Sequence, residues 1–153
     1  MTSATASIGR LADNPGFLAA RFSWFAARTA NTTLNAFDLT IRPYSALELA
    51  TVGDGVTQRD IARILRIDPS AVVGIVDQLA ERGLVVREED SRDRRRTLVC
   101  ATDAGIALAA RAAAALSAAY DEMLRSLTAD ERDSVGATLR ALALLPELDI
   151  PGA

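Results

Sequence analysis

The spacing of apolar side chains predicts a helical protein with a short hairpin in its second half. From residue 15 onward, Leu18, Phe22 and Phe25 recur at intervals of four and three residues, which is the spacing of one helix face. Phe17 and Trp24 form a neighbouring stripe, so the apolar arc is wider than one core face requires. Two explanations stay open for this helix: a second subunit covers it, or it is buried within a single chain.

Two short helices follow a predicted helix over residues 39–51. Thr57 is suited to cap the first of them, with Asp60 three residues on as in a capping box. Asp68 is suited to cap the second, and Pro69 fits its first position. The side chains predicted to face the core are Ile61, Ile64 and Leu65 from the first helix and Val72, Ile75, Val76 and Leu79 from the second. Two capped helices joined by a tight turn predict a helix-turn-helix.

Beyond Gly83, which is expected to end the second helix, the pattern changes to that of strands. Residues 84–86 and 97–101 are β-prone runs, and residues 87–96 between them carry no apolar side chain. A hairpin with a long charged tip directly after a helix-turn-helix is predicted to be a wing.

The rest of the chain is predicted to be helical, apart from a frayed tail at residues 1–14. One helix covers residues 103–126, and a full capping box from Thr128 to Glu131 begins another. The apolar stripe of this last helix is Val135, Leu139, Leu142 and Leu145, and Pro146 ends it. The predicted fold class is mainly α with a small β-hairpin wing. Residues 1–153 form a single domain, in which a winged helix-turn-helix at 39–102 lies between helices at 15–38 and 103–146.

Composition excludes much catalytic chemistry. The 153 residues include 17 cationic side chains, all arginine, against 20 carboxylates, and no histidine. Without histidine and with the single cysteine Cys100, nearly all zinc and iron sites and the usual nucleophile–base pairs are absent, so we expect no metal, no cofactor and no enzyme. The chain has no signal-peptide pattern at its start and no apolar run that could span a bilayer, so we expect a cytoplasmic protein.

The second short helix presents an outward face that fits DNA. Ser70 and Gln78 can hydrogen-bond to base edges, Ala71 or Val73 can contact a thymine methyl group, and Gly74 permits close approach. Since this face lacks an arginine, we expect groove shape to supply part of the specificity. The side chains expected to meet phosphates, which position a protein without reading sequence, are Thr57, Gln58, Arg59 and Arg63.

Taken in order, these segments resemble the MarR-type winged-helix regulators over about residues 15–145. The resemblance is carried by residues 57–62 of the first short helix, by residues 69–72 and 76–85 in and directly after the second, which would be the recognition helix, and by the segments 90–95 and 102–105. It implies a homodimer whose N- and C-terminal helices interlock and which binds a palindromic operator. It also implies a transcriptional regulator, expected to be a repressor, that a small aromatic molecule or oxidation releases from DNA.

The same resemblance assigns further residues. Arg94 is expected to enter the minor groove, with Arg92 and Arg95 beside it, while Asp90 and Asp93 brace the wing, with Arg87 as their expected partner. The effector cleft would lie near Phe25, Phe37 and Tyr44. Arg66 departs from the family, which usually has glycine in this turn, so a left-handed backbone there would carry a steric cost.

Two alternatives to this interpretation remain. A winged-helix module that binds protein and not DNA would share the fold and would not need arginines at the wing tip. A redox role for Cys100 is a second possibility, because strand alternation leaves this thiol partly exposed, although no histidine or second cysteine would activate it. An enzyme is disfavoured, since the paired carboxylates Glu88 and Glu89 fall in a solvated hairpin.

Overall fold

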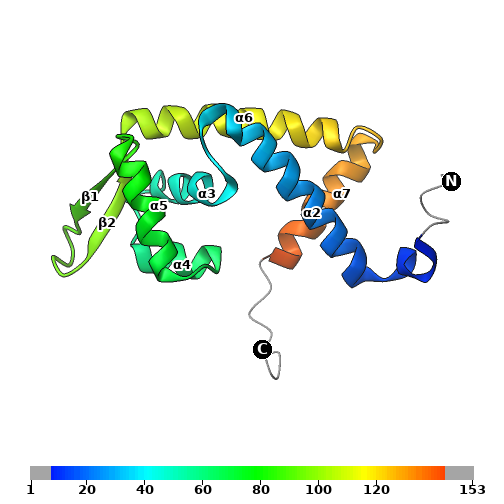
Figure 1. The fold of residues 1–153 in the computed structure, drawn as a ribbon, viewed down its shortest axis with the longest axis horizontal. Coiled ribbons are helices and arrows are strands. Elements are labelled where there is room, and N and C mark those ends of the chain that lie inside the picture. Colours follow the sequence, from blue (N-terminus) through cyan, green and yellow to red (C-terminus); the bar gives the residue numbers. More distant parts are fainter. Residues whose placement is uncertain (1–7, 144–153) are drawn as a thin grey trace, which may run out of the picture.

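The computed structural model describes residues 8–143, most of which are helical (Figure 1). The chain begins with the 3-10 helix η1 (Gly9–Asp13), the long helix α2 (Pro15–Leu34) and the 3-10 helix η2 (Asn35–Phe37). The central part contains α3 (Ile41–Ala50), α4 (Gln58–Leu65), α5 (Pro69–Glu81), and the strands β1 (Val85–Glu89) and β2 (Thr97–Ala101). The last helices are α6 (Asp103–Met123) and α7 (Ala129–Ala143). This order confirms the predicted fold class.

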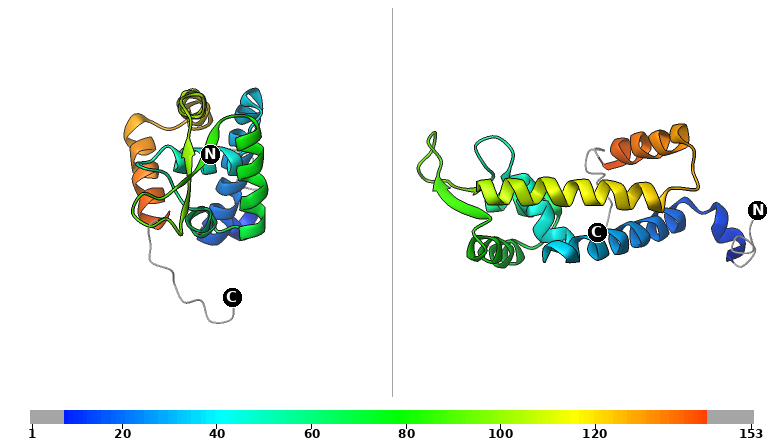
Figure 2. Two further views of the ribbon diagram at one scale, coloured as in Figure 1. Left: turned by 90° about the vertical axis from the view of Figure 1, so that its left-hand side faces the viewer. Right: turned by 90° about the horizontal axis from the view of Figure 1, so that it is seen from above.

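The helix α6 is the longest element and connects the two ends of the molecule. The helices α3 to α5 and the hairpin gather at its N-terminal end, and α2 and α7 lie toward its other end (Figures 1 and 2). A hollow of about 450 Å³ lies between α2 and α7, and the side chains around it are mostly apolar: Leu18, Ala19, Phe22, Leu124, Leu127, Ser134, Val135, Thr138 and Leu139.

The helices begin where the sequence places their caps. The Thr57 hydroxyl oxygen accepts a hydrogen bond from the Asp60 amide at 3.1 Å, and the Asp68 carboxylate accepts one from the Ser70 amide at 2.7 Å. The capping box of α7 is complete, since Thr128 N–H donates to Glu131 Oε2 at 2.8 Å and Glu131 N–H donates to Thr128 Oγ1 at 3.3 Å. Each cap satisfies an amide that the helix leaves without a partner.

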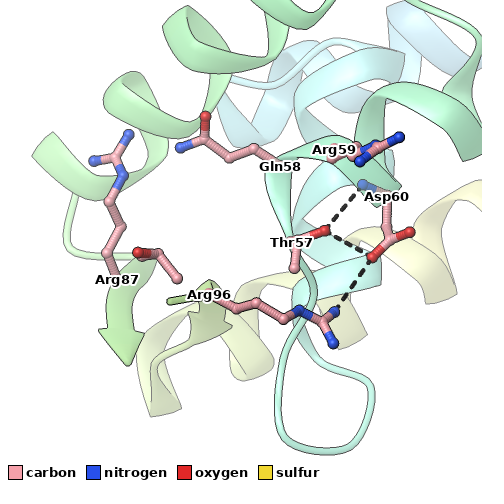
Figure 3. A pocket seen from close by; sticks show the side chains of 7 residues that line it. Thr57, Gln58, Arg59, Asp60, Arg87 and Arg96 are labelled. Atoms are coloured by element: carbon pink, nitrogen blue, oxygen red, sulfur yellow. Dashed lines mark hydrogen bonds and ion pairs between the residues drawn. The ribbon is translucent and has the colours of Figure 1, made fainter. Parts of the chain in front are cut away.

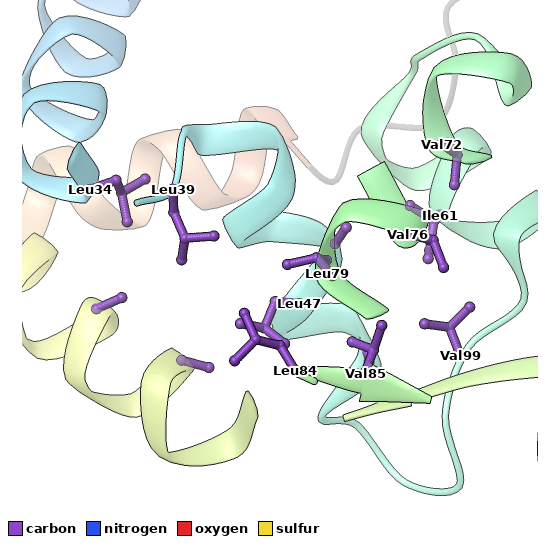
Figure 4. Packing of buried hydrophobic residues seen from close by; sticks show 14 of the residues in the cluster. Leu34, Leu39, Leu47, Ile61, Val72, Val76, Leu79, Leu84, Val85 and Val99 are labelled. Carbon is purple, nitrogen blue, oxygen red and sulfur yellow. The ribbon is translucent and has the colours of Figure 1, made fainter. Parts of the chain in front are cut away.

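One hydrophobic cluster joins the helix-turn-helix to the hairpin. Val72, Val76 and Leu79 of α5 are buried, as predicted, and they pack in the same cluster as Ile61 of α4 and Leu47 of α3 (Figure 4). The hairpin closes the cluster from the other side with Val85 and Val99. The recognition helix is therefore held by a buried face that leaves its opposite face to solvent.

The wing is an antiparallel pair in which Val85 lies opposite Ala101 and Glu89 opposite Thr97. Gly83, at a φ of +68°, turns the chain from α5 into β1, as expected. Val56 adds a bridge to the outer side of β2: its amide donates to the Val99 carbonyl at 3.0 Å, and its carbonyl oxygen accepts from the Val99 amide at 2.8 Å. The loop before α4 is thereby joined to the wing, a connection that the sequence pattern did not reveal.

The long apolar helix α2 is not covered by the rest of residues 8–143. The exposed fractions of Leu18, Trp24 and Phe25 are 43%, 57% and 42%. The described residues therefore do not bury this helix as the single-chain alternative requires, and its wide apolar arc is available to a second subunit.

Three boundary or burial predictions are corrected. Residues 9–13 were expected to be a frayed tail but form η1, directly before Asn14, whose side chain caps α2. Helix α6 ends at Met123, three residues earlier than expected. Ile64 was predicted to be buried but is 47% exposed, because at about 100° per residue it lies to one side of the arc through which Ile61 and Ala62 reach the core. The predicted end of α7, with Leu145 and Pro146, lies outside the described residues.

Candidate nucleic-acid interface

Helix α5 presents the predicted face to solvent. The five residues of this helix that are expected to meet DNA are all exposed: Ser70, Ala71, Val73, Gly74 and Gln78. Asp77 is exposed on the same face. The Ser70 hydroxyl also donates to the Asp68 carboxylate, and these bonds to Ser70 lower the pKa of Asp68. Asp68 therefore stays ionised as the helix cap, and the Ser70 oxygen keeps lone pairs for an outside donor.

The turn between α4 and α5 depends on a strained residue. Arg66 has φ 51° and ψ 48°, in the left-handed region that favours glycine. The condition stated for this residue is therefore met, and a left-handed residue with a side chain costs about 1 kcal/mol or more. The Ile67 amide, which follows it, donates to the Ala62 carbonyl at 3.1 Å and closes the turn.

The start of α4 forms one wall of an open hollow of about 760 Å³, and the strands of the wing form the other (Figure 3). Its lining residues are Thr57, Gln58, Arg59, Asp60, Arg87, Arg96 and Thr97. Three of the four residues predicted to meet phosphates line this hollow, whereas Arg63 lies on the next turn of α4 and pairs with Asp60 at 3.3 Å.

The carboxylate of Asp60 contacts polar and charged side chains in and beside this hollow. Thr57 Oγ1 donates to Asp60 Oδ2 at 2.7 Å, and Arg96 Nη2 lies 3.9 Å from the same oxygen. The hydrogen bond from Thr57, and then the nearby Arg63 and Arg96, hold the pKa of Asp60 below its usual value. Asp60 therefore offsets part of the positive charge that Arg59, Arg87 and Arg96 bring to the hollow.

The wing tip is braced by two aspartates, as predicted. Asp90 is 8% exposed, accepts a hydrogen bond from the Arg92 amide at 2.8 Å and has Arg96 at 3.7 Å. Asp93 accepts from the Arg95 amide at 3.0 Å. The expected partner Arg87 is wrong, since its guanidinium reaches Asp77 on α5. The reason is its place in the hairpin, where it lies opposite Val99 and points across the sheet toward α5 and not along it toward the tip.

The arginines of the wing differ in whether a carboxylate of the described chain pairs with them. Arg92 pairs with Asp54 at 3.0 Å, with side chains 83% and 77% exposed, and Arg96 lies between Asp60 and Asp90. Within residues 8–143, no carboxylate forms an ion pair with the guanidinium of Arg94 or Arg95. Both side chains are exposed. The wing tip therefore ends in two arginines that are available to an outside anion.

The three candidate effector residues do not gather in one place. Phe25 is exposed on α2, where it lines two shallow hollows with Trp24, and neither hollow includes Phe37 or Tyr44. Phe37 lies under the guanidinium of Arg111, at 5.7 Å from the ring centre. The Tyr44 hydroxyl donates to Glu48 Oε1 at 2.7 Å, and burial, followed by Glu48, raises the pKa of Tyr44.

Cys100 is held as a thiol. Its Sγ donates to the Asp54 carbonyl at 3.2 Å, and burial, followed by the charges of Glu88 and Asp54, raises its pKa. Because the thiolate is the reactive form, a raised pKa slows reaction with oxidants and disulfides.

We therefore expect hydrogen peroxide to leave the DNA affinity of the protein unchanged, within about twofold, because Cys100 has little thiolate. The folded protein should also react with an aromatic disulfide reagent more slowly at pH 8 than the same protein in denaturant. A loss of affinity on peroxide treatment that is absent in Cys100→Ser would show that the thiol is a sensor after all.

In the described part of the chain, no cluster of three or more carboxylate, cysteine or histidine side chains is arranged to hold a metal ion. Between residues 8 and 143, no helix is both long enough and apolar enough to cross a bilayer.

Known proteins are similar to this chain in sequence and in fold. Residues 37–96 match the sequence pattern of the MarR family. A putative transcriptional regulatory protein for the hcr operon of Thauera aromatica is 31% identical over 116 residues, which cover 76% of this chain and 68% of that protein. The structure of CouR from Rhodococcus jostii RHA1 with p-coumaroyl-CoA bound is 36% identical, with a TM-score of 0.79. The match covers 91% of this chain and 98% of the CouR chain.

A third similarity is to a DNA complex. The structure of S. aureus MepR with DNA is 25% identical, with a TM-score of 0.67, over 84% of this chain and 96% of that one. The Thauera relative is more than 30% identical, and most of its length is matched. The MarR family pattern coincides with the helix-turn-helix and wing. The two comparisons therefore agree. The chain therefore belongs to the MarR family of transcriptional regulators.

Proposed function

We propose that this protein is a homodimeric repressor that binds a palindromic operator and is not an enzyme. Residues 39–102 would be the DNA-binding region, with α5 in the major groove and the wing in the adjacent minor groove. The observation that carries the proposal is the exposed face of α5 next to a wing tip whose Arg94 and Arg95 lack a carboxylate partner in the described chain. The cell compartment of such a regulator is the cytoplasm, where its operator lies.

The residues divide by role. Ser70, Ala71, Val73, Gly74 and Gln78 face the base edges, and Arg92, Arg94 and Arg95 reach the minor groove. Thr57, Gln58, Arg59 and Arg63 meet the phosphates. Residues 57–96 hold nine arginines against eight carboxylates, so affinity depends on where these charges lie and not on their sum.

The dimer would form through residues 15–38 and 103–146. The exposed Leu18 and Trp24 of α2 and the exposed Leu139 and Leu142 of α7 supply apolar surface that a second copy can cover. A two-fold axis would place two copies of α5 on successive turns of one face of the DNA, and this geometry requires an operator with inverted symmetry.

An aromatic effector would release the dimer from DNA. The support is the p-coumaroyl-CoA bound to CouR, a structure of similar fold, together with aromatic side chains on the helices that flank the winged region. Of the three candidate contacts, Phe25 lines two hollows on α2 that include neither Phe37 nor Tyr44, so Phe25 would contact an effector separately from the other two.

The experiment that tests the function is fluorescence anisotropy with the DNA upstream of the protein's own gene. Scrambled DNA of equal length is the control, and both are titrated at two salt concentrations. We expect selective binding of the upstream DNA that weakens steeply with salt, because arginine–phosphate contacts release counterions. Aromatic acids and their CoA thioesters are then added to the complex, and a fall in anisotropy with one of them identifies the effector class.

Failure to bind either DNA at low salt would contradict the proposal. The alternative function, a winged-helix module that binds protein, would then take its place. Selective binding without any response to aromatic compounds would retain the regulator and remove only the aromatic effector.

A further inference from the structure

A negative charge lies on the face that α5 presents to DNA. Asp77 is on this face, about one helical turn after Val73, and its side chain is 50% exposed. Negatively charged phosphates line both edges of a major groove. An isolated carboxylate at this position would lie close enough to be repelled by them. A DNA-binding face with such a residue needs a counter-charge.

The wing supplies that charge. Arg87 lies on β1, and its Nη2 atom is 2.5 Å from Asp77 Oδ1, across the gap between the hairpin and the recognition helix. The Arg87 side chain is 35% exposed, and it also borders the hollow at the start of α4. An exposed ion pair of this kind adds little to folding stability. Its main effect is on the charge that the surface offers to DNA.

We propose that Arg87 is a positioning residue that neutralises Asp77 and so permits the recognition helix to enter the major groove. The pair also ties the base of the wing to α5, so that both DNA-contacting elements keep one relative orientation. In this role Arg87 is occupied by the protein and makes no phosphate contact of its own. This inference rests on the proposed DNA-binding function.

The test is a double-mutant cycle on operator affinity, measured by anisotropy with the full-length protein. Arg87→Ala should lower affinity about tenfold, since it leaves Asp77 uncompensated opposite the phosphates. Asp77→Asn alone should change affinity less than about threefold, because Arg87 already cancels this carboxylate. The double variant, which has the parent's net charge, should return to within about threefold of the parent.

Two controls separate this role from a structural one. The thermal midpoint of each variant should stay close to that of the parent, since the pair is exposed. Arg10→Ala removes an exposed arginine of η1, outside both the DNA-binding and the dimer-forming residues, and should leave DNA affinity unchanged. This result would show that the loss of one positive charge does not by itself lower the affinity.

Three results would overturn the inference. Additive effects, in which Asp77→Asn raises affinity equally with and without Arg87, would mean that Arg87 contacts phosphate independently. A change of base preference in Asp77→Asn alone would mean that Asp77 reads a base, such as a cytosine amino group. If the parent itself binds no DNA, the proposed function fails and this inference fails with it, a result distinct from additivity.

Discussion

Replacing Arg94 by alanine is expected to lower operator affinity by about tenfold or more while the dimer stays intact. Arg94 lies at the wing tip and has no carboxylate partner within residues 8–143, so its charge is free to meet the strong negative potential of a narrow minor groove. Anisotropy on operator DNA measures the loss, and sedimentation at the same concentration checks the dimer. The slope of affinity against salt should also fall by about one, as expected when one phosphate-neutralising contact is removed.

Arg92→Ala is the informative comparison for Arg94. Arg92 is already paired with Asp54 at 3.0 Å, so a contact with DNA would require this ion pair to break. We therefore expect Arg92→Ala to lower operator affinity less than Arg94→Ala does. Equal binding by Arg94→Ala and the parent would remove the wing from the mechanism and leave α5 as the main source of affinity.

The largest effect on stability is expected from Gly105→Ala. Gly105 is in the first turn of α6, where a Cβ atom would overlap the carbonyl oxygen of Leu84 and lie 3.2 Å from Leu47 Cδ1. That carbonyl also accepts the Thr102 amide at 3.0 Å, so any shift pulls apart the junction of α6 and the wing. We expect a loss of about 3 kcal/mol, near the upper range for overpacking.

This loss should lower the thermal midpoint by roughly 6–12 °C for a chain of this length, measured by circular dichroism. Gly74→Ala is the matched control, because Gly74 is also helical and nothing lies within 4 Å of an added Cβ there. Alanine at that site should leave the midpoint unchanged or raise it slightly, since it favours the helix by up to about 1 kcal/mol. A midpoint of Gly105→Ala equal to that of the parent would show that Leu84 can move without cost.

Features decided by neighbouring residues could be predicted from the sequence. The caps at Thr57, Asp68 and Thr128 depend on side chains within three positions of the amides that they bind, so spacing alone identified them. The exposed face of α5 followed from its buried stripe for the same reason.

Features decided by distant contacts could not be predicted. Arg87 pairs with Asp77 because the hairpin folds back over α5, and nothing in the charged run of residues 87–96 distinguishes this partner from Asp90 or Asp93. The bridge from Val56 to Val99 joins residues that are far apart in the chain. The division of wing arginines into paired and unpaired ones likewise depends on Asp54 and Asp60, which lie before the recognition helix.

The exposure of α7, which faces α2 across an apolar hollow, has a consequence for how much regulator a cell needs. None of its 15 residues is buried among residues 8–143, and a helix of this length is marginal in water by itself. In the proposed dimer, association would supply much of the free energy that keeps it folded, which makes stability depend on protein concentration. At low copy number the newly made chains would be more exposed to proteolysis, so the amount of intact protein would rise more steeply than its rate of synthesis.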